Sequence, residues 1–393
     1  MPHTLPTEIT ARLLLNANFV GEISAREAVT DVKDKECAAP SNRDRRASEW
    51  AWSRALSVEI RGPEIAPGLL LTAELTVYTP FECLAYERAF RPEVIPRLSH
   101  AVVRSGRRLL GIFSYYPRGK TLVVVNRLIR LPDAFLAACA AEMLRHHPSM
   151  RSVQFGDLYN GTETALDGRV RSYTWATIDC AEAELPRSYA EFLQKFGSST
   201  RKNLRYCGRR LERESPSLAF RIVQGAEFTD DMVAAVVHLN HLRMASKGKA
   251  SGMDEVYAAR LGALCRSHGV GCIAMEGSRI VAGTLCTRVG SGWTLHVIAH
   301  DPKFNHVRLG LLCLLKTVEE AIGSGATRFN FLWGASDYKV LFGGKISTLR
   351  ARRYYRNMNS QLLAFADHRD RAIQTLKRRL SAWRRAHRHA AGT

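Results

Sequence analysis

The sequence predicts an α/β protein built around a mixed sheet, in which one structural unit occurs twice. The first observation is a repeated order of strand, tight turn, strand, helix and strand, with copies about 175 residues apart. The second is the segment 329–344, in which an apolar strand ends at Gly334 and a helix start follows at once. The third is an apolar content of 46% and a charged content of 24%, typical of soluble globular proteins.

The first copy of the repeated unit lies in the amino-terminal half. Residues 107–116 and 120–129 are predicted strands, joined at 117–119 by a turn that indicates a hairpin. A proline followed by an aspartate opens an apolar-periodic helix over 132–144, and 152–155 is the strand that completes the unit.

The second copy repeats this order in the carboxyl-terminal half. Strands over 279–289 and 293–300 are joined by a turn at 290–292. Apolar residues at helical spacing then predict a helix over 308–322, and 327–332 is the strand that follows it. We therefore expect two halves of similar topology.

Two helices are predicted between the copies, over 189–196 and 200–214. Ser198 and Ser199 are the expected cap of the second helix, which ends before a proline. Four arginines recur on it every four residues, either as a solvated face or as a face that binds a polyanion. They are Arg201, Arg205, Arg209 and Arg213.

The remaining elements complete the carboxyl-terminal half. A strand is predicted over 219–223, helices over 230–243 and 255–267, and a further strand over 272–275. The loop 245–252 is rich in glycine, lysine and serine, which suits either a lid at a substrate entrance or an ordinary surface connection.

Both ends of the chain have compositions that differ from the rest. Residues 1–48 alternate in charge with few aromatics, and we expect a poorly ordered arm. From Arg369 onward an apolar stripe faces many arginines, which predicts a basic amphipathic helix that binds an anionic membrane surface, a partner or its own domain. The predicted organisation is an arm (1–48), a degenerate amino-terminal domain (49–186), a carboxyl-terminal domain (187–362) and the helix (363–393).

The net charge of +20 is concentrated in three segments. Residues 201–213, 350–356 and 369–388 carry +5, +4 and +7 of it. Such concentration indicates a polyanionic partner, namely a phosphate-bearing cofactor, nucleic acid or an anionic membrane.

The nine cysteines form no C-x-x-C pair, and their odd number does not suit a disulfide framework, so buried reduced thiols are expected. We expect no metal site. The first residues lack a basic-then-apolar signal pattern and no apolar run is long enough to span a bilayer, which predicts a cytoplasmic protein, peripheral to the inner membrane face if its tail binds there.

The segment 329–344 is the strongest candidate for a functional site. A strand end that leads into a helix start is where α/β folds present free backbone N–H groups to a ligand. Tyr338 and Lys339 follow that helix start, and a lysine there either holds phosphate or stabilises developing negative charge. The alternative is an ordinary surface lysine on a short helix.

Three stretches together resemble the GNAT acyltransferase fold, and more closely its FemAB-type or CelD-like (cellulose biosynthesis) branch, in which two GNAT-like halves share one chain. The resemblance covers about residues 70–360. The stretches are Arg201-Lys202-Asn203-Leu204-Arg205, the Gly310-containing loop after Asp301-Pro302, and Gly334-x-x-x-Tyr338-Lys339-x-x-Phe342-Gly343-Gly344.

The chain departs from this pattern at three places. Asn330 stands in the strand where relatives usually carry aspartate, and Ala335 stands after the glycine where they tend to carry an acid. The phosphate loop, 305–311, lacks the usual glycine-rich spacing.

The resemblance implies acyl-CoA as the donor substrate. Its pyrophosphate needs backbone N–H groups and positive charge, which the start of the helix over 308–322 and Arg308 would supply. Gly310 would allow close approach of the backbone, with Leu309 and Leu311 beside it. Val297, Ile298 and Gly334 complete the expected cofactor-binding set. The alternative for Arg308 is a solvent-facing residue.

The sequence leaves three candidates for the general base, namely His296, Asp337 and water. Thr294, His296, Ile298 and His300 are expected on one face of their strand, and His296 is best placed if that face lines the cleft. Asp337 or water are the other choices, although Asp337 is already explained as a helix cap. Tyr338 either protonates the leaving thiolate or packs, and the resemblance places Lys339 at the active site.

The leading hypothesis is an N-acyltransferase that moves an acyl group, in the first instance acetyl, from acyl-CoA to an amine in a ternary complex. A second hypothesis uses aminoacyl-tRNA as donor and an envelope or polysaccharide precursor as acceptor, although no long helical hairpin of that branch is visible. A third is a non-catalytic GNAT-like protein that binds nucleic acid or anionic lipid.

Overall fold

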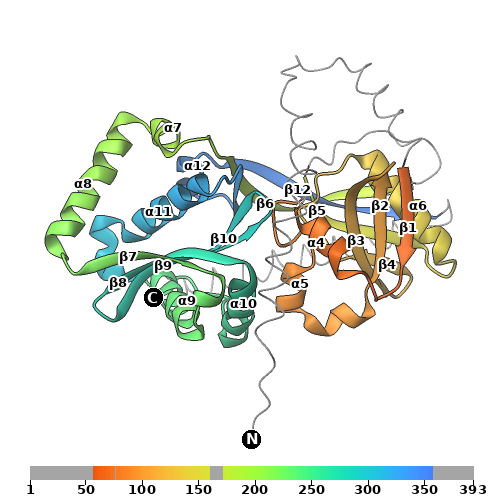
Figure 1. Ribbon diagram of the computed structural model, residues 1–393, viewed down its shortest axis with the longest axis horizontal. Coiled ribbons are helices and arrows are strands. Elements are labelled where there is room, and N and C mark those ends of the chain that lie inside the picture. Colours follow the sequence, from red (N-terminus) through yellow and green to blue (C-terminus); the bar gives the residue numbers. More distant parts are fainter. Residues whose placement is uncertain (1–55, 76, 160–170, 357–393) are drawn as a thin grey trace, which may run out of the picture. The chain divides into compact units, whose positions relative to one another are not determined.

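A mixed sheet of twelve strands runs through the part of the chain that the computed structural model describes, which is residues 56–75, 77–159 and 171–356 (Figure 1). In sheet order these strands are β1-β2-β3-β4-β5-β12-β6-β11-β10-β9-β8-β7. Their bounds are β1 Leu56–Arg61, β2 Ser99–Ser105, β3 Arg108–Arg118, β4 Thr121–Val124, β5 Ser152–Leu158, β6 Arg171–Glu184, β7 Leu218–Gln224, β8 Gly269–Glu276, β9 Arg279–Val289, β10 Gly292–His300, β11 Arg328–Trp333 and β12 Lys345–Tyr355.

Helices connect these strands and cover the sheet. They are α4 Pro67–Leu75, α5 Ala85–Phe90, α6 Asp133–His146, α7 Tyr189–Gln194, α8 Ser198–Glu214, α9 Asp230–Ala245, α10 Glu255–His268, α11 Leu309–Gly323 and α12 Asp337–Leu341, with the 3-10 helices η1 Pro92–Arg97, η2 Gly225–Glu227 and η3 Pro302–Val307. The expected serine cap of α8 is wrong, because Gly197 is the N-cap and Ser198 is already helical.

The predicted repeat is confirmed by the pairing of the strands. In the first half β3 and β4 are antiparallel and β4 and β5 are parallel. In the second half β9 and β10 are antiparallel and β10 and β11 are parallel. The crossover helices α6 and α11 occupy equivalent places, because a parallel pair requires a long connection.

The two central strands, β12 and β6, exchange places between the halves. β6, which follows the first unit in sequence, pairs with β11 of the second unit, whereas β12 pairs with β5 of the first (Figure 1). β6 and β12 also pair with one another, so the sheet is continuous through its centre. Each half is therefore completed by a strand from the other, and the domain boundary at 186/187 stays a prediction.

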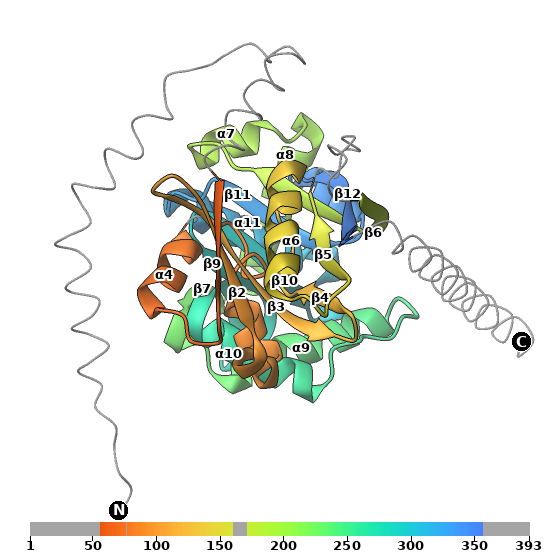
Figure 2. The ribbon, with the colours of Figure 1, turned by 90° about the vertical axis from the view of Figure 1, so that its right-hand side faces the viewer.

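The first half has helices on both faces of its strands (Figure 2). Ala73 of α4 packs with Val102 and Ile112 on one face. Leu136 of α6 packs with Ala101 and the neighbouring inward residues on the other. Successive strand residues thus alternate between two buried layers, which explains why these strands are apolar throughout.

The second half is layered in the same way. Helices α7 and α11 pack on one face of β10 and β11 in a cluster that includes Leu314 and Phe329. Helices α9 and α10 pack on the other face around Val236 and Leu264, and α5 of the first half joins this second cluster through Phe90. The cluster around Val236 and Leu264 therefore contains residues of both halves.

The eight described cysteines are buried and free, as the sequence predicted, and Cys37 lies outside the described residues. Burial raises the pKa of the Cys83 and Cys265 thiols to about 12, so both stay protonated at neutral pH. None of the described helices has the length and apolar character that a membrane crossing requires. The predicted arm (1–48) and basic helix (363–393) lie outside the described residues.

Candidate active site

Strands β10 and β11 are paired over only part of their length. Their parallel ladder contains Gly292 to Thr294 on β10 and Arg328 to Asn330 on β11, and it ends there. β10 continues to His300 with β9 on its other side. Beyond residue 294 the β11-facing edge of β10 therefore has no strand partner among the described residues, and this edge is the start of the candidate site.

A β-bulge in β10 overturns the expectation that residues 294, 296, 298 and 300 share a face. The register with β9 shifts between Leu295 and Val297. Leu295 packs in the α11 cluster, whereas Val297 packs with α9 and α10, and Ile298 returns to the α11 side. The bulge inserts one extra residue and reverses which side chains point to each face of the sheet. Ile298 and His296 therefore do not share a face by simple alternation.

His296 is held at the bulge by protein groups. Its Nε2 lies 2.9 Å from Oγ1 of Thr287, and its ring is 6.1 Å from the ring of Phe81. Burial lowers the pKa of His296 to about 4. His296 is therefore neutral but a weak proton acceptor at neutral pH, and its role as general base stays a prediction.

The start of α11 presents positive potential beside the open edge of β10. Arg308 is the N-cap, in a left-handed conformation with φ of 53°, so the expected helix begins one residue later than predicted. Its side chain is exposed and forms no ion pair with a described residue. The helix dipole and the N–H groups of the first turn add to this charge.

Gly310 allows the side chain of His300 to pack closely against the first turn of α11. A β-carbon added there would lie 2.7 Å from Nδ1 of His300, so the side chain of His300 fits only against glycine. Nε2 of His300 lies 2.8 Å from Oδ1 of Asn305, and its buried Nδ1 has no hydrogen-bond partner among the described residues. Leu309 is buried and Leu311 packs against the α11 cluster.

The short helix α12 carries three of the predicted catalytic residues in different environments. Ser336 is its N-cap, so Asp337 is the first helical residue rather than the cap, and its side chain is exposed. Tyr338 packs on the α11 cluster, with its ring 6.4 Å from that of Phe331. Burial raises the pKa of Tyr338 to about 12, so its phenol stays protonated at neutral pH.

Lys339 is a buried lysine, with 4% of its surface exposed. Its Nζ donates to the main-chain carbonyls of Leu332 (3.2 Å), Trp333 (2.6 Å) and Gly334 (3.1 Å). Because an ammonium group has three N–H donors, all of them are engaged. The predicted contact with an oxyanion or phosphate would require one of these bonds to break.

These bonds hold a strained turn at the end of β11. Leu332 has a φ of 55° and Gly334 a φ of 82°, both in the left-handed region. The N–H of Leu332 donates to Oδ1 of Asn330 at 2.8 Å, and Lys339 binds its carbonyl. A leucine in this conformation costs about 1–3 kcal/mol and persists only where its surroundings hold it.

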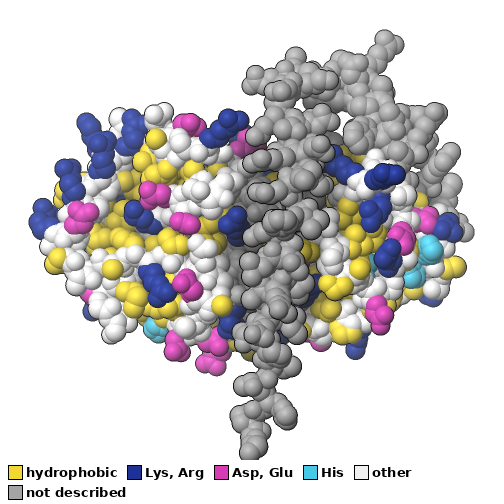
Figure 3. Space-filling view, viewed as in Figure 1, with side chains coloured by type: hydrophobic (Ala, Val, Ile, Leu, Met, Phe, Trp, Pro, Cys, Tyr) yellow, Lys and Arg dark blue, Asp and Glu magenta, His cyan; other side chains and the backbone are white. Residues whose placement is uncertain are grey.

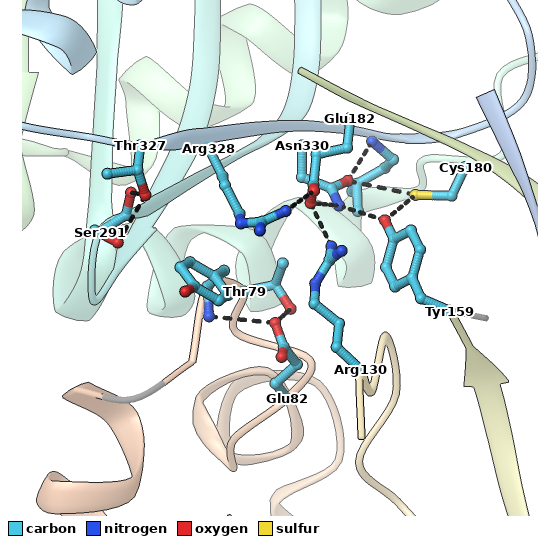
Figure 4. A network of polar contacts seen from close by, with 12 residues as sticks. Thr79, Glu82, Arg130, Tyr159, Cys180, Glu182, Ser291, Thr327, Arg328 and Asn330 are labelled. Carbon is cyan, nitrogen blue, oxygen red and sulfur yellow. Dashed lines mark hydrogen bonds and ion pairs between the residues drawn. The ribbon is translucent and has the colours of Figure 1, made fainter. Parts of the chain in front are cut away.

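The departure at Asn330 has a physical explanation. Its Nδ2 donates to the hydroxyl of Tyr159 (3.0 Å) and to Oε2 of Glu182 (3.3 Å), while its Oδ1 accepts from Leu332 (Figure 4). An aspartate would place a second carboxylate against Glu182, and like charges at this distance repel. Asparagine therefore suits a site that already contains Glu182.

Glu182 connects the two halves. Arg130 of the first half donates to Oε2 at 2.5 Å, and Arg328 of the second half donates to Oε1 at 2.9 Å (Figure 4). Arg130 also lies 3.7 Å from the centre of the Tyr159 ring, and Arg328 lies 4.8 Å from that of Tyr78. The sequence analysis did not identify Glu182, Arg130 or Arg328 as functional residues. The strand β6, which carries Glu182, could have been predicted from the alternation of aromatic, β-branched and polar residues over 171–184.

Basic residues at the end of α9 act on the same region. The charges of Arg243 and Lys247 lower the pKa of His300 in addition to burial, which is the larger cause. Arg243 also acts on Tyr338, and it lowers the pKa of Lys247. Lys247 belongs to the loop predicted as a substrate entrance, so the loop contributes positive charge near the candidate site.

The structure thus brings together only part of the predicted set. Ile298, Leu311 and Tyr338 pack against one cluster. Gly310 lies against the side chain of His300. Val297 packs on the α9 side, the ring of His296 lies 6.1 Å from that of Phe81, and Arg308 and Asp337 are exposed. The described residues contain no group of three or more side chains arranged to hold a metal ion.

Comparison with known proteins supports this topology. Residues 198–340 match the family described as Acetyltransferase (GNAT) domain. This match covers α8 through most of α12, and so includes β10, β11 and the start of α11. No curated protein sequence matches the chain.

Solved structures extend the similarity over both halves. FemX is 10% identical and has a TM-score of 0.55 over 78% of this chain and 99% of its own. The C-terminal domain of a putative lysylphosphatidylglycerol synthetase from Agrobacterium fabrum is 12% identical, with a TM-score of 0.46 over 77% and 95%. A tandem GNAT protein from the clavulanic acid biosynthesis pathway is 14% identical, with a TM-score of 0.37 over 76% and 98%. The likeness to FemX shows that the described chain has a GNAT-like fold, and residues 198–340 are similar to the acetyltransferase domain of that family.

Proposed function

We propose that this protein is an N-acyltransferase that transfers an acyl group, acetyl in the simplest case, from acyl-CoA to an amine in a ternary complex. The observation that carries the proposal is the unpaired edge of β10 beside the start of α11. An extended pantetheine arm with its amide groups can add to such an edge as a strand does. The CelD-like relationship belongs to this proposal.

The start of α11 suits the pyrophosphate of the donor. Free N–H groups of the first turn, the positive end of the helix and the exposed guanidinium of Arg308 converge there. Arg243 and Lys247 add positive charge on the α9 side. The buried, unpartnered Nδ1 of His300 lies beside the same turn and is a further polar group that a ligand would satisfy.

The reaction requires attack of the amine nitrogen on the thioester carbonyl, loss of one nitrogen-bound proton and departure of the thiolate. The edge of β10 beyond Thr294 has no strand partner among the described residues, so its N–H groups can stabilise the developing oxyanion. Tyr338 retains its proton at neutral pH and can donate it to the thiolate. The nitrogen-bound proton goes to water or to the exposed carboxylate of Asp337, because the pKa of His296 is lowered to about 4 and makes it a weak base at neutral pH.

Replacing Arg308 by alanine should weaken acetyl-CoA binding about tenfold, because one charge-assisted contact to phosphate is lost. Isothermal titration at low and high salt measures the change, and the difference should shrink as salt screens the charge. Lys303→Ala is the matched control, since Lys303 is an exposed cation of the neighbouring η3 helix. Absence of acetyl-CoA binding to the wild type at millimolar concentration would refute the proposal.

Replacing Tyr338 by phenylalanine should lower kcat about a hundredfold and leave KM for acetyl-CoA nearly unchanged, because only the proton donor is removed. The control is Tyr189→Phe, which removes a hydroxyl from another half-buried tyrosine packed on the same cluster. Steady-state rates of thiol release with excess amine give both constants. If both substitutions changed kcat equally, Tyr338 would contribute only packing and would not be the proton donor.

A second candidate, an aminoacyl-tRNA-dependent transferase, is favoured by α8. Its exposed face carries Lys202, Arg205, Arg209 and Arg213, and the basic side chains over this helix are visible at the upper left of Figure 3. Such a face suits a phosphate backbone. Supplying acetyl-CoA and aminoacyl-tRNA in parallel to one preparation, with a labelled amine, identifies the donor that yields product.

A further inference from the structure

A cavity of about 260 Å³ lies in the amino-terminal half, and none of the residues assigned to acyl transfer lines it. Its wall is built from α4, residues 77–84, β3 and residues 126–131. A water molecule occupies about 30 Å³ of liquid, so the cavity has room for a small organic molecule. The sequence offered no sign of it.

The wall combines an apolar lining with a few polar groups, which is the usual composition of a small-molecule site. The apolar part includes side chains of α4, β3 and the segment before α6, and the polar part comes from residues 77–84 and 126–131 as well as from α4 and β3. Apolar members are Leu70, Leu109, Ile112, Ile129 and Leu131, and polar members include Tyr78, Glu82, Asn126 and Arg130.

Glu82 is fixed in position by its neighbours (Figure 4). Its Oε1 accepts from the N–H of Tyr78 and the hydroxyl of Thr79, both at 3.2 Å. Nδ2 of Asn126 donates to the carbonyl of Glu82 at 2.7 Å, while Oδ1 of Asn126 accepts from the N–H of Ser114. The carboxylate is therefore preorganised at the wall before any ligand binds.

The other charged groups near the wall already have partners or face solvent. Arg130 is paired with Glu182 at 2.5 Å. Glu74 is paired with Arg88 at 3.4 Å. Arg108, on β3, is exposed to solvent. Glu82 forms no ion pair with a described residue, which makes it the carboxylate at this wall that lacks a cation.

The titration of Glu82 agrees with this arrangement. Burial is the largest influence and raises its pKa to about 7, with Arg130 lowering it and Glu182 raising it by smaller amounts. Cys83, the neighbouring titratable group on the wall, stays neutral because burial raises the pKa of its thiol to about 12. A bound cation would therefore find a carboxyl group that ionises readily near neutral pH.

We propose that this cavity binds a small organic amine, whose ammonium group donates a hydrogen bond to Glu82 while its carbon skeleton packs on the apolar wall. A cation supplies the charge that Glu82 lacks, whereas an anion would be repelled and an uncharged ligand would leave the carboxylate uncompensated. This site needs neither acyl-CoA nor group transfer, so it goes beyond the proposed function.

The test uses the full-length protein and three probes of similar shape, namely 2-phenylethylamine, 2-phenylethanol and 3-phenylpropanoate. Isothermal titration should show one amine bound per chain and at least tenfold weaker binding of the alcohol and the carboxylate. Amine affinity should rise about tenfold from pH 6 to pH 8, because the bound state requires ionised Glu82 while the amine stays protonated throughout.

Two variants locate the site. Glu82→Gln keeps an oxygen that can accept from Tyr78 and Thr79, so it should fold as the wild type does and lose amine affinity at least tenfold. Glu93→Gln, at an exposed glutamate of η1 in the same half, should bind the amine unchanged. Melting curves of both variants verify that they are folded.

The proposal is overturned if the alcohol binds the wild type as tightly as the amine, if no amine binds at millimolar concentration, or if folded Glu82→Gln keeps its affinity. Were Glu82→Gln to fail to fold, the probe series and pH profile of the wild-type protein would still decide the matter. Acetyl-CoA titration of the same preparation is independent, so failure of the amine site and failure of the acyltransferase proposal are separate results.

Discussion

Replacing Glu182 by glutamine lowers the free energy of unfolding by about 3 kcal/mol, because it leaves two arginines without their counter-charge. Only 10% of the Glu182 side chain is exposed, against 22% for Arg130 and 30% for Arg328. Breaking a buried ion pair on one side is far more costly than replacing both partners, and here one carboxylate serves two cations. Denaturant unfolding with fitted m-values measures the change.

The matched control is Glu184→Gln, two residues along the same strand. Glu184 is exposed and forms no ion pair with a described residue, so its substitution should stay within about 0.5 kcal/mol of wild type. A Glu182→Gln protein as stable as the Glu184→Gln protein would contradict the role of Glu182 as the contact that joins the halves.

Replacing Lys339 by methionine should destabilise the protein by about 3 kcal/mol, because three main-chain carbonyls around a buried side chain lose their donor. The turn at Leu332 would also lose a contact that holds its left-handed backbone. Thermal and denaturant unfolding report the loss, and Lys345→Met, at an exposed lysine of β12, should leave stability nearly unchanged. Activity falls as well if the end of β11 positions Tyr338.

The pH dependence provides a second measurement for Lys339. Burial lowers its pKa to about 8 in the folded chain, against 10.5 as the ordinary value. Between pH 8 and pH 10.5 Lys339 is more protonated in the unfolded chain than in the folded chain. The free energy of unfolding therefore increases as the pH rises through this range. The advantage of wild type over Lys339→Met should therefore grow from pH 7 to pH 9.5.

The two measurements also separate a structural role of Lys339 from a chemical one. A Lys339→Met protein that is as stable as Lys345→Met yet inactive would show that the ammonium acts on substrate rather than on the turn. A destabilised protein whose remaining folded fraction transfers acyl groups at the wild-type rate would show the reverse.

The local elements were largely predictable because they depend on neighbours along the chain. The hairpin over 279–300 and helix α11 have the periodicity and turn residues that their backbones require, and the structure confirms both within one or two residues. The stretch 329–344 likewise forms a strand, a glycine turn and a short helix as expected. The alternation along β10 was wrong, because a bulge depends on the partner strand.

By itself the sequence determined the repeated unit, the GNAT-like character of the second half and the identity of the residues around α11 and α12. Only the tertiary structure decided that β6 and β12 complete opposite halves and that Lys339 donates to three carbonyls. It also decided that Glu82 lines a cavity and that Glu182 pairs with two arginines. Local periodicity is set within a few residues, whereas these contacts join groups as far apart as Arg130, Glu182 and Arg328, whose meeting depends on the whole sheet.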